Sequence, residues 1–297
     1  MTSRHWQIFV AVADCGTMSA AARRMTITQP SISQAISDIE REYGVLLFSR
    51  VGKRLRLTET GQDFLPYAKR MLSLEKEADE FLRSASAAKR LRVGATVTVG
   101  TCLIAPLLEE LGRRIPTIRT EASVANTSRI ESRLLSGELD VGLVEGRVSS
   151  PELLVEHVIR DELVFICGEA STLWGRESVS LFDLAGQPLI LREAGSGTRA
   201  QLEYHMRQRN LPADIRWDCC NTEAILTAVS RGHGVSVLSR RLVDGSLLRR
   251  HLWAAPIADE NFGRHFDLVY HKDHLVGEEM RVFADICREF EAGLLPD

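Results

Sequence analysis

The spacing of apolar residues changes abruptly at residue 91, and this change constrains the fold more than any other feature of the 297-residue chain. Before it, apolar residues recur at helical spacing. After it, short apolar runs at 91–95, 141–144, 163–166 and 188–191 alternate with helical segments such as 103–111. Such alternation is typical of an α/β domain and indicates a mainly parallel sheet. We therefore expect a small helical head followed by an α/β body.

The first sixty residues predict three short helices and a β-hairpin. The first helix ends at Gly16, Ser19 can cap the second, and the third begins near Pro30, which suits a first helical turn. Gly44 ends the third helix. The basic stretch 50–54 contains a glycine between alternating residues, which indicates the hairpin.

This arrangement fits a winged helix-turn-helix. The alanines at 20–22 allow two helices to cross closely, and the isoleucines of the third helix would hold it down on one face. The opposite face carries polar side chains that can donate to base edges or to phosphates. The DNA contacts predicted from this face are Thr28, Gln29, Ser31, Ser33, Gln34 and Ser37. In the hairpin, or wing, Arg50, Lys53 and Arg54 are predicted to contact backbone phosphates or the adjacent minor groove.

Residues 59–88 predict one long helix, whose internal Pro66 lies near its first turns. Its apolar residues alternate at spacings of four and three, which is typical of a helix that pairs with a second copy. These residues are Tyr67, Met71, Leu74, Ala78, Phe81 and Ala85. A surface helix that packs on its own domain is the alternative. The chain next to this helix offers no apolar core for it to pack on, so dimerisation is favoured.

Composition and motifs exclude several classes of protein. Residues 1–90 carry 14 basic and 10 acidic side chains, and residues 91–297 carry 23 basic and 30 acidic side chains. A modestly basic head therefore precedes an acidic body, which fits a nucleic-acid-binding head. No apolar run is long enough to span a bilayer and no signal peptide is evident, so we expect a cytoplasmic protein. No HExxH, GxSxG or P-loop motif occurs, so nothing in the sequence indicates an enzyme.

The six cysteines form no CxxC pair, so neither a zinc site nor a disulfide framework is indicated, and we expect no metal or cofactor. Buried free thiols are the simplest interpretation in a reducing cytosol. The vicinal pair Cys219 and Cys220 leaves a redox-sensing regulator open, although adjacent cysteines rarely form a relaxed disulfide.

The stretch SAAARRMTITQPSISQAI at 19–36, with LLFSR at 46–50 and LTETG at 57–61, strongly resembles the LysR-type transcriptional regulators. The resemblance extends to the layout of essentially the whole chain. It implies a winged helix-turn-helix at 1–61, a linker helix for dimerisation at 62–89, and a two-lobed α/β effector-binding domain of periplasmic-binding-protein type at 90–297. Lobe I would comprise about 90–160 and 266–297, and lobe II about 161–265.

The resemblance also implies roles for individual residues of the head. The positions that match Gln29, Pro30, Ser33 and Gln34 contact bases in that family, and wing residues such as Arg50 and Arg54 contact the DNA backbone. Many members have arginine where Gln34 stands, so we expect the preferred bases to differ here.

Three turns in the body can supply helix N-termini, where free N–H groups and the helix dipole favour an anion. They lie at 94–101, 192–199 and 220–223, and a purely structural cap is the alternative at each. In a fold whose ligands lie between two lobes, these turns together indicate one effector site. Its predicted residues are Thr96, Val97, Thr98, Asn126, Glu145, Ser196, Gly197, Thr198, Arg199 and Thr222.

Two of these residues have a second interpretation. Glu145 would repel a dianion, which favours a protonated or hydroxyl-bearing ligand or a purely structural role for this side chain. Arg199 stands where a helix begins, and a salt bridge with a neighbouring carboxylate is as good an interpretation as contact with a ligand.

Residues 192–199 and 221–229 resemble the branch of the family associated with sulfur assimilation, which implies an oxyanion such as sulfite or sulfate as effector. A small organic acid is the alternative. The implied function is a transcriptional regulator whose effector modulates binding of double-stranded operator DNA by a homo-oligomer, a dimer of dimers, with RNA polymerase as a further candidate partner. A solute-binding protein would share the body but not residues 1–61, so it is the remote alternative.

Overall fold

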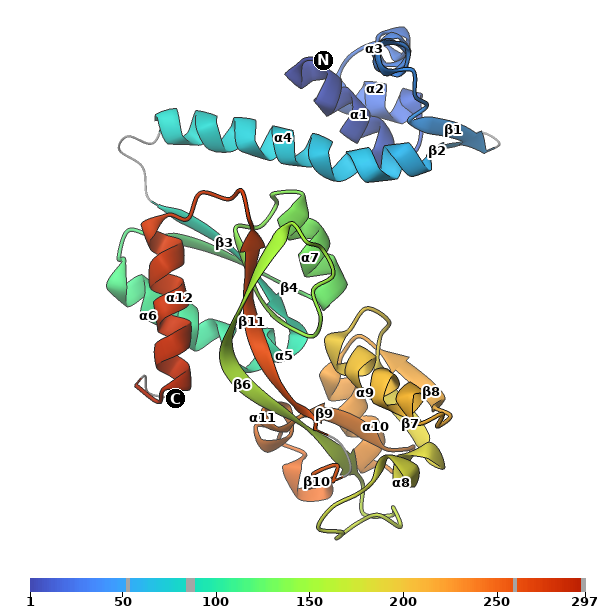
Figure 1. Cartoon of the computed structure of the whole chain (residues 1–297), viewed down its shortest axis with the longest axis vertical. Helices are drawn as coiled ribbons and strands as arrows, with labels where there is room; N and C mark the ends of the chain where they lie inside the picture. The colour runs from blue at the N-terminus through green and yellow to red at the C-terminus, as the bar shows by residue number, and fades with distance from the viewer. Residues whose placement is uncertain (52–53, 84–88, 259–260, 295–297) are drawn as a thin grey trace. The chain divides into compact units, whose positions relative to one another are not determined.

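The computed structural model describes residues 1–51, 54–83, 89–258 and 261–294 (Figure 1). Contacts between residues divide the chain into two compact units. The first is Met1–Ala87 together with Leu135–Glu138, and the second is Ala88–Leu134 together with Leu139–Asp297. No helix in the described part of the chain is long and apolar enough to cross a membrane.

The first unit contains the helices and hairpin that the sequence predicts. They are α1 (Ser3–Cys15), α2 (Met18–Met25), α3 (Gln29–Tyr43), β1 (Phe48–Val51), β2 (Arg54–Leu57) and α4 (Glu59–Arg83). Gly16 and Gly44 end α1 and α3 with φ near 67°, a left-handed conformation that glycine adopts without strain. The predicted cap of α2 was wrong. Thr17, rather than Ser19, is the N-cap, and its hydroxyl accepts a hydrogen bond from the Ala20 N–H at 3.2 Å.

A single apolar core holds the three short helices and the wing together. Phe9 of α1 and Ile32 and Ile36 of α3 are fully buried in it. The Glu40 carboxylate accepts hydrogen bonds from the backbone N–H groups of Leu47 and Phe48, at 2.8 and 3.2 Å. These hydrogen bonds attach α3 to the start of the hairpin and so fix the exposed faces of the two elements relative to each other.

The linker helix α4 packs on the head at one end only. Trp6 stacks on Phe64, with ring centroids 5.3 Å apart, and Ala68 is fully buried. Beyond that contact, Tyr67, Met71 and Leu74 are 59%, 47% and 46% exposed. Of the other residues of the predicted seam, Ala78 is exposed and Ala85 lies outside the described residues. An apolar row that remains open to solvent in the single chain supports pairing with a second copy.

We expect Leu74→Asp to weaken dimerisation at least roughly tenfold, because burying an unpaired charge in a helix pair costs more than 1 kcal/mol. Sedimentation of the full chain across a concentration series measures this directly. Gln62→Asp, an exposed position of the same helix off the seam, is the matched control. Unchanged association of the Leu74 variant would show that α4 does not pair.

The second unit is a two-lobed α/β domain. Its first lobe is built from β3 (Arg90–Thr96), β4 (Arg119–Ala125), β5 (Val141–Glu145), α5 (Val97–Cys102), α6 (Ile104–Arg114), α7 (Thr127–Leu135) and α12 (Glu278–Glu291). Its second lobe is built from β7 (Pro188–Arg192), β8 (Asp214–Cys219), β9 (Ser236–Ser239), β10 (Trp253–Ala255), α8 (Leu181–Ala185), α9 (Gly197–Gln208), α10 (Thr222–Ser230), α11 (Arg240–Asp244) and the 3-10 turn Arg249–His251. Each lobe buries apolar clusters of its own.

Two long strands, β6 (Leu153–Cys167) and β11 (Gly263–His271), join the lobes. They pair antiparallel with each other, β11 pairs antiparallel with β5, and β6 pairs antiparallel with β9 and β10. Parallel pairing joins β3 to β4 and β5, and β7 to β8, with isolated parallel bridges at Val179–Ile257 and Leu189–Val235. The expectation of a mainly parallel sheet was therefore wrong. The apolar run at 163–166 is the end of a strand that crosses both lobes, which apolar spacing alone does not reveal.

Candidate DNA-binding face and effector cleft

The N-terminus of α3 is exposed to solvent. Thr28 caps the helix, and its hydroxyl lies 2.8 Å from that of Ser31 and 3.4 Å from the Ser31 N–H. Thr28, Gln29, Pro30 and Ser31 are all exposed. Four consecutive exposed residues at a helix start can enter a major groove without a change in the fold.

Gln29 shares a groove with the wing. This groove, of about 350 Å³, is lined by Gln29, by Arg50 and Arg54 of the hairpin, and by residues of α2. Two guanidinium groups therefore lie close to a side chain that can pair with a base edge, which suits simultaneous phosphate and base contact. Lys53, also predicted as a wing contact, lies outside the described residues.

The rest of the predicted α3 face is less uniform. Gln34 and Ser37 are exposed, and Ser33 is half-buried. The Gln34 amide nitrogen donates to Asp38 at 2.9 Å, and Asp38 also pairs with Arg41 at 2.6 Å. The Gln34 amide nitrogen is thus engaged by Asp38, and the amide oxygen is left to accept a hydrogen bond from a base.

Sequence reasoning missed two residues of α2 and its cap that line the same groove. Thr17 and Ser19 stand beside Gln29 there. Because the Thr17 hydroxyl caps α2, the Ser19 hydroxyl does not serve as that cap. Serine hydroxyls can contact phosphate, and the place of Ser19 in the first turn of α2 is the signal that could have identified it.

In the second unit, three of the five predicted effector residues of lobe I form one buried cluster, and Val97 and Asn126 are half-buried. The Thr96 hydroxyl donates to one carboxylate oxygen of Glu145, and the Thr98 hydroxyl donates to the other at 3.1 Å. All three side chains are 1% exposed. The Thr127 hydroxyl donates to the Glu145 carbonyl at 2.6 Å, which fixes the end of β5.

The two lobes touch beside this cluster. Gly146, with φ of 91°, and Gly197 approach so closely that a Cβ on Gly197 would lie 2.3 Å from the Glu145 carbonyl oxygen. Asn126 donates to the Ala194 carbonyl at 3.4 Å, while its side-chain oxygen accepts from the Arg129 N–H and caps α7. These contacts bring the turn of lobe II at 192–199 against lobe I, as the sequence predicts.

Arg264 of β11 is a member of this site that the sequence did not reveal. Its Nη1 donates to the Thr198 hydroxyl at 2.9 Å, and its Nε pairs with Asp161 at 2.7 Å. The side chains of Arg264 and Asp161 are 6% and 1% exposed. A charged pair buried where β6 and β11 cross from lobe to lobe cannot be recognised until the two strands are paired.

Arg199 adopts the salt-bridge alternative. Its guanidinium donates to Glu203 at 2.7 Å and to Asp218 at 2.7 Å. Hydrogen bonding to Glu203, followed by that to Asp218, holds the pKa of Arg199 above its ordinary value. This arginine braces α9 against β8 instead of pointing to a free ligand position.

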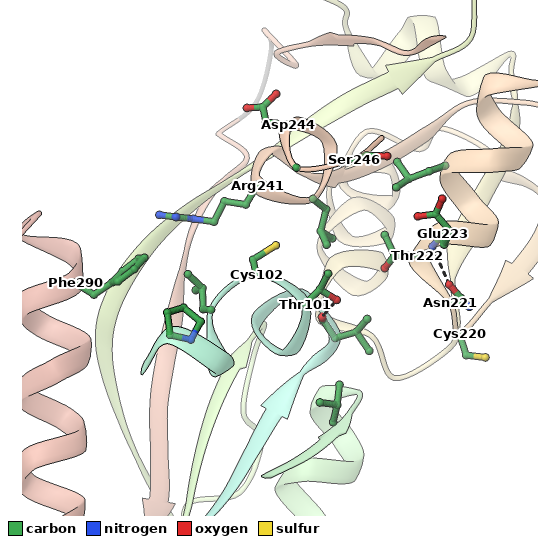
Figure 2. A pocket seen from close by; sticks show the side chains of 17 residues that line it. Thr101, Cys102, Cys220, Asn221, Thr222, Glu223, Arg241, Asp244, Ser246 and Phe290 are labelled. Carbon is green, nitrogen blue, oxygen red and sulfur yellow. Dashed lines mark hydrogen bonds between the residues drawn. The ribbon is translucent and has the colours of Figure 1, made fainter. Parts of the chain in front are cut away.

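An open cavity of about 1120 Å³ lies between the lobes next to the buried cluster. Figure 2 shows Thr101 and Cys102 of α5 on one side and Arg241 and Thr222 on the other. Asn221 caps α10, accepting from the Glu223 N–H at 2.8 Å, as expected for this turn. Among the predicted effector residues, Val97 and Thr222 line the cavity. Because Val97 lies between Thr96 and Thr98, the cavity and the cluster adjoin.

Two family models match the chain and together cover most of it. Residues 3–62 match the bacterial regulatory helix-turn-helix protein, lysR family, and residues 84–292 match the LysR substrate binding domain. The chain belongs to the LysR family of transcriptional regulators. The prediction from the sequence is confirmed: this LysR-type protein is a DNA-binding regulator with a winged helix-turn-helix and a two-lobed effector-binding domain, and not an enzyme.

Relatives match along nearly the full length of the regulator. It is 31% identical over 287 residues to the HTH-type transcriptional regulator YeiE of Escherichia coli K12, with 97% of each chain covered. It is 29% identical to the HTH-type transcriptional regulator CysL of Bacillus subtilis, with 82% of each covered. Full-length OxyR of Pseudomonas aeruginosa aligns with a TM-score of 0.69 at 23% identity over 97% of this chain and 95% of that one. CbnR in complex with its target DNA aligns with a TM-score of 0.66 at 21% identity, covering 97% and 99%. At these identities, the two structures support the fold alone.

Unsatisfied buried polar atoms of the LysR-type regulator include two at helix N-termini of lobe II. Within the described ranges, four buried side-chain atoms have no hydrogen-bond partner: Ser196 Oγ, Thr222 Oγ1, Ser236 Oγ and Arg264 Nη2. Thr222 begins α10 and lines the cavity, Ser196 is the N-cap of α9, and Arg264 donates to Thr198 of that helix. Ser236 belongs to β9. Buried polar groups are almost always paired, so such atoms are candidates for contact with a ligand.

Cys102 beside the cavity and Cys219 of the vicinal pair do not have the surroundings of reactive thiols. Burial raises the pKa of Cys102 to about 11, and burial is also the main reason that the pKa of Cys219 is raised. Redox-sensing cysteines have a lowered pKa, because the thiolate is the reactive form. Cys220 is exposed.

We expect hydrogen peroxide to leave DNA binding by the reduced regulator unchanged, and Cys219→Ser/Cys220→Ser to behave identically. Fluorescence anisotropy with labelled DNA, before and after peroxide, measures this. Loss of binding by the wild type that the double variant resists would instead support the redox alternative.

Proposed function

We propose that this LysR-type regulator acts in the cytoplasm and binds a small anionic effector in its interlobe cleft, and that the effector alters how two or more copies bind operator DNA. The observation that carries the proposal is the grouping of Ser196 Oγ, Thr222 Oγ1 and Arg264 Nη2, three buried donors without a partner among the described residues. One of them is cationic and two are hydroxyls, a combination that suits an acid group.

The surroundings of these donors support an anion. Ser196 is the N-cap of α9 and makes no capping hydrogen bond, so the first N–H groups of a 12-residue helix lie beside its hydroxyl. Thr222 begins α10 and faces the open cavity (Figure 2). Helix N-termini of this kind favour negative charge. The cavity of about 1120 Å³ exceeds what an inorganic oxyanion needs, so a small organic acid fits as well as sulfite or sulfate.

The cleft offers a route from effector to DNA through lobe geometry. β6 and β11 cross from one lobe to the other, and Arg264 stands at that crossing. A ligand that binds one arrangement of the lobes better than another shifts the population toward it by its differential affinity. In a dimer of dimers joined through linker helices and effector domains, such a shift would change the spacing of the winged helices on the operator. An activating regulator would in addition contact RNA polymerase, which is a further proposed partner.

Thermal denaturation of the full chain against a panel of oxyanions and small organic acids, at matched ionic strength, tests the proposal. A ligand of the folded state raises the midpoint in proportion to RT ln(1 + [L]/Kd). We expect at least one acid to do so, and Ser196→Ala and Thr222→Val each to weaken its binding by roughly tenfold or more, since each removes a hydrogen bond to a charged group.

Ser236→Ala is the matched control for Thr222→Val, because it removes a buried and unpartnered hydroxyl that, unlike that of Thr222, does not line the cavity. It should leave the ligand-induced shift unchanged. Absence of any shift across the whole panel would overturn the proposal, and so would equal losses in the Ser236 and Thr222 variants.

A further inference from the structure

The buried Glu145 side chain stands in the cleft as a carboxylate without a counter-ion. It is the last residue of β5 and is 1% exposed. Within the described chain, no arginine, lysine or histidine lies at ion-pair distance from it. Hydrogen bonds from Thr96 and Thr98 are what satisfy its two oxygens. Burying a carboxylate in this way is unfavourable unless all its acceptors are used, so these hydroxyls are committed to it.

Because these hydroxyls are committed, they do not serve as donors to a free anion at this point. Two hydroxyls held at the end of one strand would otherwise suit two oxygens of a tetrahedral oxyanion. Glu145 has taken their hydrogen bonds and presents only acceptor lone pairs. Lobe II, in contrast, has buried donors that are not used. Ser196 Oγ and Arg264 Nη2 are unused donors, and Gly197, which lies between Ser196 and Thr198, touches the backbone of Glu145 and Gly146.

The buried side chains of the cleft therefore place a carboxylate acceptor on lobe I and unused donors on lobe II. We infer that Glu145 selects the protonation state of the effector: the cleft takes an acid group that keeps one O–H, donated to Glu145, and rejects the fully deprotonated anion of the same shape. This inference rests on the proposed anion site in the same cleft and names the class of ligand it takes, an oxyanion or acid that carries a hydroxyl.

Selection of the protonated acid and rejection of the deprotonated anion both follow from hydrogen-bond chemistry. An anion with no proton places its oxygens against the Glu145 carboxylate, and two acceptors that face each other in a buried site repel. An anion that keeps an O–H donates it to the carboxylate in a short charge-assisted hydrogen bond, while its other oxygens accept from Ser196 and Arg264. The same residue thus penalises one form and stabilises the other.

Phosphate and sulfate are the decisive probes, because they share a tetrahedral shape and phosphate keeps a proton at neutral pH whereas sulfate keeps none. Isothermal titration of the full-length chain with each salt, at constant ionic strength in a chloride background, measures the ratio of the two affinities. We expect the wild type to bind phosphate at least tenfold more tightly than sulfate. Glu145→Ser removes the carboxylate, frees two threonine hydroxyls and adds a third, so it should gain sulfate binding and reverse the preference.

Glu145→Gln provides the near-isosteric variant in case the serine variant is unstable. Its amide nitrogen can donate to an oxyanion, so the preference for phosphate should fall at least tenfold. Glu110→Gln, an acidic residue of α6 paired with Arg113 and Arg114, is the matched control and should keep the wild-type ratio. Equal wild-type affinity for both anions, no wild-type binding of either, or an unchanged preference in the Glu145 variants would each overturn the inference.

The test separates this inference from the proposed function. If the Glu145 variants exchange their preference but no ligand alters DNA binding, the selectivity of the cleft stands and the regulatory proposal fails. If an acid alters DNA binding and the preference ignores Glu145, the regulatory proposal stands and the inference fails.

Discussion

Gln29→Ala is expected to weaken binding to the specific DNA site by about 1–3 kcal/mol, which is roughly 5- to 150-fold in affinity. Gln29 is exposed at the start of α3 and shares a groove with Arg50 and Arg54. A glutamine amide there can form a bidentate pair with adenine, and the two arginines supply phosphate contacts that are independent of sequence. The loss should therefore appear on the specific site, obtained by in vitro selection, and not on random DNA.

Fluorescence anisotropy at fixed salt on both DNA sequences measures the difference. Gln7→Ala, an exposed glutamine of α1, is the matched control and should bind both sequences like the wild type. Arg54→Ala should instead weaken binding to both sequences alike and reduce the salt dependence, as expected for a phosphate contact. Equal losses on specific and random DNA in the Gln29 variant would show that this residue contacts phosphate or supports the fold.

Arg264→Met is expected to destabilise the effector domain by about 3–5 kcal/mol, because it removes the nearer cation from buried Asp161 and leaves Arg241, 4.0 Å away, beside it. The pair is 2.7 Å apart, with side chains 6% and 1% exposed, and Asp161 also accepts a hydrogen bond from Ser239 at 2.6 Å. Methionine fills much of the volume that arginine leaves, so loss of packing contributes little. Urea denaturation of the full chain, followed in the transition of the effector domain, measures the change.

The double variant Arg264→Met/Asp161→Asn identifies the cause of that loss. Removing the Asp161 charge should recover about half of the lost stability or more, since the cost comes chiefly from a buried charge that has lost its nearest partner. Arg240→Met is the matched control: Arg240 pairs with Glu162 at 2.8 Å, but both side chains are exposed, so the effect should stay below about 1 kcal/mol. Additive losses in the double variant would show that the buried Asp161 charge is not the cause of the loss.

The head could be predicted from the sequence because its signals are local. Glycine at a helix end, proline in a first turn and isoleucine at helical spacing each act within a few residues, and α1, α3 and the wing lie where these signals place them. The cap of α2 was misplaced by two residues, because Thr17 and Ser19 are equally good caps and only the angle at which the chain enters the helix decides between them.

The cleft could be predicted only in part, because its decisive contacts join residues far apart in the chain. Thr96, Thr98 and Glu145 were predicted as ligand contacts, but the sequence could not show that the carboxylate takes both hydroxyls. Arg264 was missed because it is one arginine among many until β6 and β11 pair. Arg199 kept two interpretations until Glu203 and Asp218 were found on either side of it.

We expect a ligand in the interlobe cleft and the operator to bind to coupled sites. A titration of operator DNA into the full-length regulator, with and without the acid that most raises its thermal midpoint, measures this coupling. Binding linkage requires the acid to change operator affinity by the same factor by which the operator changes affinity for the acid. We predict a factor of roughly 5 or more in both directions, lost in Thr222→Val and kept in Ser236→Ala. Operator affinity that stays the same at saturating acid would show that the two sites are not coupled.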